Sequence, residues 1–218
     1  VTALKAELVR LIAEEGPIPI SRFMALCLGH PRHGYYRTRD PFGAQGDFTT
    51  APEISQMFGE MIGLWAAHLW QAMGSPSRFS LIEIGPGRGT LMADILRATK
   101  GVPGFHAAAQ VVLVEASPHL RKVQAVTLSG HAPRWCDRVE DLPEAPLFLI
   151  ANEFLDALPI RQFQRGPDGW QERLVGLRDG ALTFGLSALL PEVPDTVAFR
   201  DAPDAALVED CLPARLTV

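Results

Sequence analysis

Apolar residues at two different spacings predict where this chain forms helices and where it forms strands. Residues 3–15 place leucine and isoleucine three and four positions apart, which predicts an amphipathic helix ended by Gly16 and Pro17. A second short helix is expected from Ser21. A longer helix follows residues 50–53, whose Thr-x-x-Glu spacing is that of a capping box. On that longer helix we expect the large apolar side chains to face the core, namely Ile54, Phe58, Met61, Ile62, Trp65 and Leu69.

Continuous apolar runs then alternate with helical patterns. Helical patterns begin at Thr90 and at the capping pair Ser117-Pro118, and the apolar runs lie at residues 80–84, 111–115, 134–136 and 147–151. Alternation of this kind predicts an α/β domain with a parallel, doubly wound sheet.

The pattern changes after Pro159. Residues 161–164 and 171–177 resemble strands, and turn residues between them and at Asp179-Gly180 predict a β-hairpin excursion. From Glu192 onward the chain is rich in proline and acids and predicts an irregular tail.

The composition is that of an ordinary globular protein. The 218 residues are 47% hydrophobic and 21% charged, enough for one sizeable α/β domain. A net charge of -5 without any basic run argues against nucleic acid as a partner, and no apolar run is long enough to span a bilayer. Three widely separated cysteines, Cys27, Cys136 and Cys211, favour reduced thiols in a cytoplasmic compartment.

A glycine-rich turn carries the strongest chemical signal. After an apolar run that contains Glu83, glycine occupies every second position at Gly85, Gly87 and Gly89, and a helix follows. Such a turn can hold a small ligand against the helix N-terminus. It differs from a dinucleotide fingerprint, whose third glycine comes one position later, and from a P-loop, which needs a lysine. The spacing instead matches the first motif of class I S-adenosylmethionine (SAM) methyltransferases; a glycine turn without a ligand is the alternative.

Acids also follow the next two strands. Glu115 ends the second apolar run, where a carboxylate can accept hydrogen bonds from ribose hydroxyls and would lie near Gly85 at the carboxyl edge of the sheet. This geometry serves NAD as well as SAM, and a solvated acid is the alternative. Asp137 and Asp141 follow the short third strand, where an acid could meet an adenine amino group or remain unpaired in a loop.

A polar group of residues follows the fourth apolar run. Asn152 and Glu153 come directly after it, and Asp156 stands three positions beyond Glu153, so a turn would bring the two carboxylates together. Paired carboxylates suit a guanidinium and can relieve the charge of a nitrogen that loses its proton. The alternative is that Asn152 and Asp156 only cap the following turn.

Two further groups of residues are weaker candidates. Asp47 and Thr49 precede the long helix and could accept the ammonium of a cofactor, or form only an Asx turn and a cap. His30 and His33 have no cluster of acids or thiols near them in the sequence, so we expect no metal site.

Several longer motifs together resemble one family. They are His30-Pro31-x-x-Gly34-Tyr35-Tyr36, Asp40-Pro41-Phe42-Gly43, and residues 46–60, 83–91 and 151–159. These motifs are similar to the signature of the MidA-type methyltransferases, whose mitochondrial member is an arginine methyltransferase that assists assembly of respiratory complex I. The resemblance covers roughly residues 4–190.

The resemblance implies a class I SAM-methyltransferase fold, with a Rossmann-like parallel sheet, an N-terminal helical section and a β-hairpin insertion. It implies a helical section and cofactor-flanking loop in residues 1–75, a SAM-binding core in 76–160, and a hairpin substrate region with the tail in 161–218. It also implies that Asn152, Glu153 and Asp156 face the methyl acceptor. The residues implied to contact SAM are Asp47, Thr49, Glu83, Gly85, Gly87, Gly89 and Glu115.

The function implied by the resemblance is methyl transfer from SAM to a protein side chain, with arginine as the target and S-adenosylhomocysteine (SAH) as the product. The location would be the bacterial cytoplasm or the mitochondrial matrix of a eukaryote. Family members are longer, so we expect the strands that complete their sheet to be absent from this chain. Two alternatives stay open: a non-catalytic assembly module derived from a methyltransferase, and an NAD-linked oxidoreductase.

Overall fold

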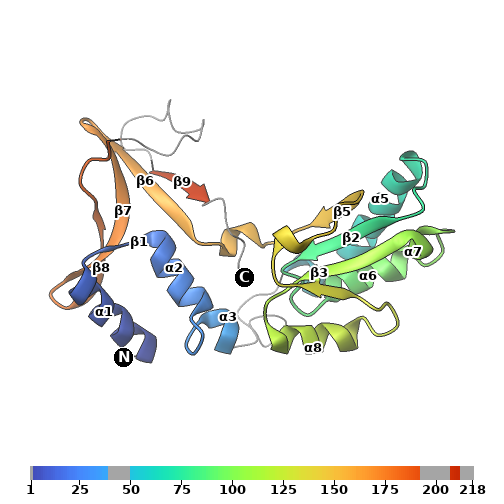
Figure 1. The fold of residues 1–218 in the computed structure, drawn as a ribbon, viewed down its shortest axis with the longest axis horizontal. Coiled ribbons are helices and arrows are strands. Elements are labelled where there is room, and N and C mark those ends of the chain that lie inside the picture. Colours follow the sequence, from blue (N-terminus) through green and yellow to red (C-terminus); the bar gives the residue numbers. More distant parts are fainter. Residues whose placement is uncertain (1, 39–49, 192–206, 212–218) are drawn as a thin grey trace. The chain divides into compact units, whose positions relative to one another are not determined.

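The structure is a computed structural model that describes residues 2–38, 50–191 and 207–211. These residues form two compact units, each with its own sheet (Figure 1). One unit contains described residues 50–156, and the other contains 2–38 with 157–191 and 207–211. This grouping differs from the three consecutive parts expected from the sequence, because the first helices pack with the late strands.

A parallel sheet forms the centre of the unit 50–156. Its strands are β2 (Phe79–Ile84), β3 (Ala109–Val114), β4 (Arg134–Cys136) and β5 (Leu147–Ile150), in the order β4-β3-β2-β5. Ile84 pairs with Val114 and Val114 with Cys136, so these three strands end level with one another. The predicted α/β fold with a parallel sheet is confirmed.

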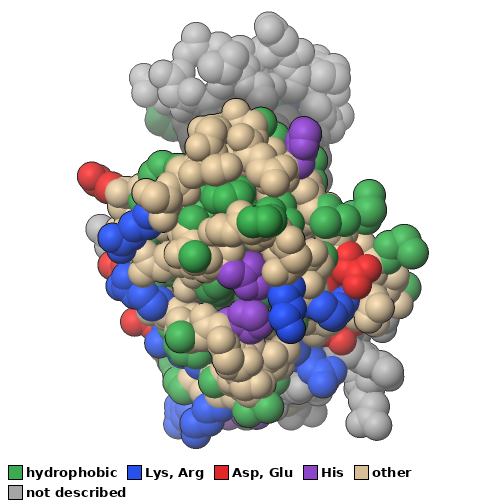
Figure 2. Space-filling view, turned by 90° about the vertical axis from the view of Figure 1, so that its right-hand side faces the viewer, with side chains coloured by type: hydrophobic (Ala, Val, Ile, Leu, Met, Phe, Trp, Pro, Cys, Tyr) green, Lys and Arg blue, Asp and Glu red, His purple; other side chains and the backbone are tan. Residues whose placement is uncertain are grey.

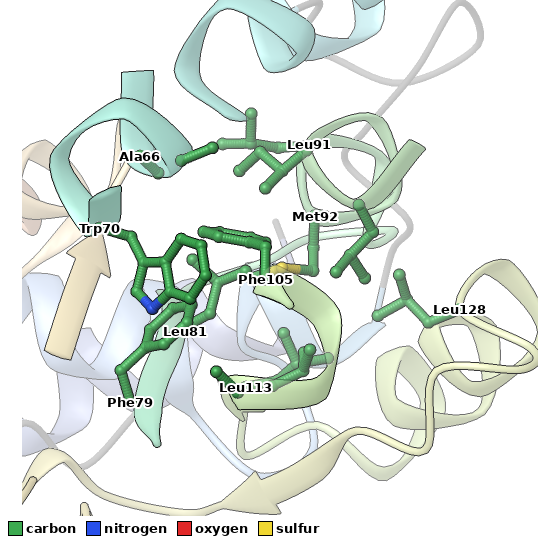
Figure 3. Packing of buried hydrophobic residues seen from close by; sticks show 14 residues of the cluster. Ala66, Trp70, Phe79, Leu81, Leu91, Met92, Phe105, Leu113 and Leu128 are labelled. Carbon is green, nitrogen blue, oxygen red and sulfur yellow. The ribbon is translucent and has the colours of Figure 1, made fainter. Parts of the chain in front are cut away.

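Helices and one hydrophobic cluster complete this unit. The helices are α4 (Ala51–Ile54), α5 (Gln56–Ala72), α6 (Thr90–Thr99), α7 (Phe105–Ala108) and α8 (Pro118–Thr127), with a 3-10 turn at Val139–Asp141. Trp70 of α5, Phe79 of β2 and Phe105 of α7 meet at the centre of the cluster, with Trp70 and Phe105 edge to face at 5.5 Å (Figure 3). Edge-to-face contact is a preferred arrangement of aromatic rings and adds to the energy of burial.

The face that α5 buries matches the expected one only in part: Phe58 and Ile62 pack against the hydrophobic cluster, but Met61 and Trp65 do not. Met61 and Trp65 are each 62% exposed, whereas the buried residues are Gly59, Gly63, Ala66, Ala67 and Trp70. A Cβ on Gly63 would lie 2.9 Å from backbone atoms of Ile95 in α6. The two helices therefore approach closely because small residues of α5 face α6, whereas Met61 and Trp65 lie on the exposed side of α5.

The start of α5 also differs from the expected capping box. Thr50 makes no side-chain cap, and Ser55 separates the short helix α4 from α5. The Ser55 hydroxyl accepts the N–H of Met57 and so caps α5. Glu53 uses its carboxylate elsewhere, as described below.

The second unit combines an antiparallel sheet with the N-terminal helices. The sheet contains β1 (Ile18–Pro19), β6 (Ile160–Gly166), β7 (Gly169–Arg178), β8 (Ala181–Leu186) and β9 (Leu207–Cys211). The helices are α1 (Ala3–Glu15), α2 (Ile20–Gly29) and α3 (Tyr35–Thr38). A 3-10 turn at Leu155–Ala157 spans the boundary between the two units in the sequence. The core of the unit is made by Leu8, Ile12, Ile18, Ile20 and Val175, so α1 and α2 cover strand β7 (Figure 1).

The predicted hairpins are confirmed, and one strand was not predicted. Asp179 and Gly180 both have positive φ, as the tight turn between β7 and β8 requires. Strand β9 pairs antiparallel with β6 over five residues, in the segment expected to be irregular. None of the described helices combines the length and apolarity needed to cross a membrane.

We expect Gly63→Ala to destabilise the unit 50–156 by about 1–3 kcal/mol, because the new methyl group collides with the α6 backbone. Helix propensity alone would predict the opposite sign, since alanine is favoured over glycine by about 1 kcal/mol. Urea denaturation of both proteins measures the difference. Met61→Ala, on the exposed face, is the control and should change the free energy of unfolding by less than about 0.5 kcal/mol.

Candidate cofactor and acceptor site

The turn that follows β2 is built from left-handed glycines. Gly85, Gly87 and Gly89 have φ values of 64°, 52° and 82°, which side chains other than glycine rarely adopt. The Gly85 N–H donates to the carbonyl of Val114 at 3.1 Å, which ties the turn to the end of β3. Gly89 is the N-cap of α6, so the turn delivers the N-terminus of that helix to the carboxyl edge of the sheet.

A second reason for glycine at position 85 is its close contact with the loop after β5. A Cβ at this position would lie 2.5 Å from the ring of Phe154, which follows β5 and is only 8% exposed. The glycine turn and the loop after β5 are therefore packed directly against each other. This contact of Phe154 was not predictable, because a single phenylalanine in a loop has no spacing that identifies its partner.

Glu83 is a buried acid with one unsatisfied oxygen. Its side chain is 3% exposed, it accepts the backbone N–H of Met92 in the first turn of α6, and its Oε2 has no hydrogen-bond partner among the described residues. Burial raises the pKa of this carboxyl to about 8.

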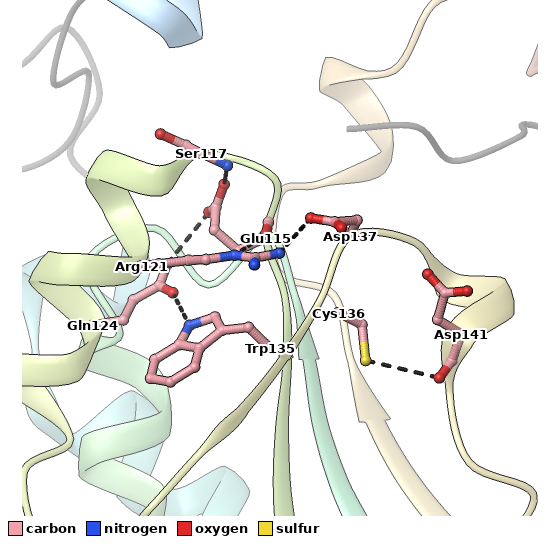
Figure 4. A network of polar contacts seen from close by, with 8 residues as sticks. All are labelled: Glu115, Ser117, Arg121, Gln124, Trp135, Cys136, Asp137 and Asp141. Atoms are coloured by element: carbon pink, nitrogen blue, oxygen red, sulfur yellow. Dashed lines mark hydrogen bonds and ion pairs between the residues drawn. The ribbon is translucent and has the colours of Figure 1, made fainter.

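Glu115 lies at the same edge and is linked to the glycine turn. Its Oε1 accepts the Ser117 N–H at 2.7 Å, and its Oε2 accepts the side-chain amide of Gln124 at 3.3 Å (Figure 4). The same amide donates to the carbonyl of Gly87 at 2.8 Å. Burial raises the pKa of Glu115, and the donors at Ser117 and Gln124 oppose that shift. The ribose-binding acid and the glycine turn expected from the sequence are thus neighbours.

Arg121 pairs with Asp137, the acid that follows β4. Its guanidinium donates to the backbone carbonyl of Glu115 at 2.7 Å and to Asp137 at 2.6 Å (Figure 4). Asp137 is therefore held beside the end of β3, whereas Asp141 contributes its backbone carbonyl to the Cys136 thiol at 3.8 Å. Of the two acids considered for an adenine contact, Asp137 is the one linked to the Glu115 network.

Glu53 contacts the glycine turn, which the capping-box interpretation did not predict. Its Oε1 accepts the Thr90 hydroxyl at 2.7 Å, and its Oε2 lies 3.8 Å from the guanidinium of Arg88. Thr90 and Arg88 flank Gly89, so α4 supports the glycine turn from the N-terminal side.

The loop after β5 carries the residues expected to face the acceptor. Asn152 is half-buried, Glu153 and Asp156 are exposed, and Phe154 between them is buried. Glu153 has a φ of 48°, a left-handed conformation that is strained for a residue with a side chain. The packing of Phe154 on Gly85 thus holds this strained loop next to the glycine turn.

Two other sets of sequence candidates have different outcomes. Asp47 and Thr49 lie outside the described residues. The described residues contain no group of three or more histidines, cysteines or acids placed to hold a metal ion. His30 is engaged otherwise: its Nδ1 accepts the N–H groups of Arg32 and His33, and its Nε2 lies 3.2 Å from Glu7.

A separate hollow of about 370 Å³ lies at the other end of α6 from the glycine turn. Figure 2 shows a face on which two histidine side chains lie beside Lys or Arg side chains, and the hollow is lined by Ala93, Leu96, Arg97, Lys100, His106, Thr127, Ser129 and His131. Burial lowers the pKa of His106, and the charges of His131 and Lys100 lower it further. Arg97 in the last turn of α6 complements the free carbonyls there and pairs with Asp94 and Glu60.

Comparison with known proteins identifies the family. A family model described as "Putative S-adenosyl-L-methionine-dependent methyltransferase" matches residues 61–212. The chain belongs to this methyltransferase family. It thereby shares the family's cofactor, SAM, which the glycine spacing predicted.

Relatives of the methyltransferase family extend the comparison. The chain is 40% identical to the Drosophila melanogaster "Protein arginine methyltransferase NDUFAF7 homolog, mitochondrial", over 92% of the chain and 52% of that protein. It is 36% identical to the human "Protein arginine methyltransferase NDUFAF7, mitochondrial", over 96% of the chain and 50% of that protein. The chain therefore spans about half the length of these curated relatives.

A solved structure has the same fold. It is a "likely methyl transferase" from Burkholderia thailandensis bound to SAH, with a TM-score of 0.79 and 31% sequence identity. The match covers 96% of this chain and 56% of that one. The predicted class I methyltransferase fold is confirmed by this similarity.

The raised pKa of the buried Glu83 carboxyl predicts how the free energy of unfolding depends on pH. Because its folded pKa is raised above the unfolded value, its contribution to stability is present below pH 4.5 and is lost as the pH rises towards about 8. In Glu83→Gln, which keeps an acceptor for Met92, this loss of at most about 1.4 kcal/mol per pH unit should disappear. Urea denaturation at pH 5, 6.5 and 8 measures it. Parallel pH profiles for both proteins would contradict the assignment.

Proposed function

We propose that this chain binds SAM at the carboxyl ends of β2 and β3 and transfers its methyl group to an arginine side chain of a protein. The observation that carries the proposal is that the Gln124 amide hydrogen-bonds to both the glycine turn and Glu115. Membership of the SAM-dependent methyltransferase family supports the cofactor, and the names of the two relatives support arginine as the target.

The cofactor would be held by groups of the glycine turn and the two buried acids. Gly85, Gly87 and Gly89 present backbone without side chains, so a ligand can approach it closely. The carboxylate of Glu115 retains unused lone pairs for ribose hydroxyls, and Glu83 provides an acceptor for the ammonium. Asp47 and Thr49 would line the pocket from the N-terminal side. When bound, SAM supplies an electrophilic methyl group on its sulfonium.

The loop after β5 would hold the acceptor. Glu153 and Asp156 are exposed carboxylates that can accept the parallel N–H groups of a guanidinium, and the Asn152 amide can orient it. The same carboxylates can take up the proton that the nitrogen loses on methylation. Because Phe154 packs on Gly85, these residues are positioned by the same turn that would hold the cofactor.

The wider biological role is proposed from the relatives and the family resemblance. Both named relatives are mitochondrial, so we propose the mitochondrial matrix for a eukaryotic source and the cytoplasm for a bacterial one. The resemblance to MidA-type methyltransferases supports a protein substrate connected with assembly of a respiratory complex.

The cofactor assignment predicts saturable binding of SAH by isothermal titration calorimetry. Glu115→Gln should weaken that binding about tenfold or more, because hydrogen bonds to a charged carboxylate contribute about 1.5–3 kcal/mol. Lys122→Gln, an exposed change on α8, is the control and should bind as the wild type does. Preferential binding of NAD by a protein shown to be folded would favour the oxidoreductase alternative.

If Glu153 and Asp156 hold the methyl acceptor, changing them should reduce methyl transfer without weakening cofactor binding. Glu153→Gln with Asp156→Asn should reduce transfer of tritiated methyl from SAM into protein by about 100-fold, while SAH affinity changes less than about twofold. The assay uses an extract that lacks the endogenous enzyme, and acid hydrolysis should release the label as methylarginine.

If the double variant transferred methyl groups as fast as the wild type, the acceptor assignment would be contradicted. If the variant lost transfer yet restored the biological phenotype of a deletion strain, the non-catalytic assembly alternative would be favoured. Glu144→Gln, an exposed acid on the segment before β5, is the matched control for loss of negative charge.

A further inference from the structure

Gln124 is a fully buried polar residue at the centre of the network around Glu115. It lies on α8, is 0% exposed, and uses both polar atoms of its side chain. Its Nε2 donates to the carbonyl of Gly87 at 2.8 Å and to Glu115 at 3.3 Å, and its Oε1 accepts the indole N–H of Trp135 at 2.8 Å. Figure 4 shows the side chain between Glu115 and Trp135. The turn after β2, the residue after β3 and strand β4 therefore meet at one amide.

The chemistry of the partners fixes the orientation of this amide. An indole N–H can only donate, and a backbone carbonyl can only accept. The oxygen of Gln124 must therefore face Trp135, and the nitrogen must face Gly87 and Glu115. A flipped amide would leave both the indole N–H and the Gly87 carbonyl without a partner, which is unfavourable for groups removed from water.

The two donors to the Glu115 carboxylate lie at different distances. The Ser117 N–H holds Glu115 Oε1 at 2.7 Å, whereas Gln124 holds Oε2 at the longer distance of 3.3 Å. Gln124 also packs against the turn, since a Cβ on Gly89 would lie 3.5 Å from its Cγ. Its removal would free both the carboxylate and the Gly87 carbonyl to move relative to each other.

We propose that Gln124 is a positioning residue that sets the Glu115 carboxylate against the glycine turn so that both can engage the ribose of the cofactor. The inference rests on the proposed function, because it takes Glu115 as the ribose-binding acid. A purely structural role, in which Gln124 only fills and satisfies the core, is the competing explanation. The two differ in which part of the ligand should lose affinity when the amide is removed.

The test compares Gln124→Met, which keeps the side-chain length, with the wild-type chain against two ligands. The ligands are SAH and its 2′,3′-dideoxy analogue, which lacks both ribose hydroxyls. If Gln124 acts through Glu115, the variant should bind SAH about tenfold more weakly but the analogue less than about threefold more weakly. Equal weakening for both ligands would show a structural role and overturn the proposal. If the wild type bound neither ligand, the proposed function itself would fail, and this inference with it.

A second variant keeps the proposal testable if Gln124→Met does not fold. Trp135→Phe removes the indole N–H and makes the ring smaller, so the amide loses the partner that fixes its orientation. It should weaken SAH about twofold to fivefold, again with less effect on the dideoxy analogue. Val126→Ala, an exposed change on the same helix, is the control and should leave both affinities unchanged. An unchanged SAH affinity in Trp135→Phe would contradict the role assigned to the amide.

Discussion

The left-handed turn after β2 is the constraint on which the rest of the candidate site depends. Because Gly85, Gly87 and Gly89 all have positive φ, the chain reverses within a few residues and α6 starts at the edge of the sheet. The same reversal exposes the Gly87 carbonyl to Gln124 and brings Gly85 under Phe154. A side chain at any of these glycines would be strained, and at Gly85 it would also separate the turn from the loop after β5.

Buried acids beside this turn carry an energetic cost that the fold does not fully offset. Glu115 receives donors on both oxygens, whereas Glu83 Oε2 has no partner among the residues that the structure describes. Burial raises the pKa of both carboxyls. In the proposed function the cofactor would supply hydroxyl donors to Glu115 and an ammonium to Glu83, so the burial that costs stability would also serve binding.

Local chemistry made some features predictable. The glycine turn follows from backbone sterics, and Ser117 caps α8 as its position before Pro118 indicates. Other features depend on contacts between distant segments. Helix α5 is apolar around most of its circumference, so periodicity did not reveal that the small residues near Gly63 pack on α6. Likewise, nothing around Gln124 in the sequence indicates that Gly87, Glu115 and Trp135 will surround it.

A crystal structure of this chain with SAH tests the account most directly. The account predicts the ribose hydroxyls within hydrogen-bond distance of Glu115, the homocysteine end beside Glu83, and the ligand against the backbone of Gly85 and Gly87. It would be contradicted by SAH bound elsewhere, such as in the hollow beside His106, or by Glu115 still held only by protein donors with the ribose out of reach.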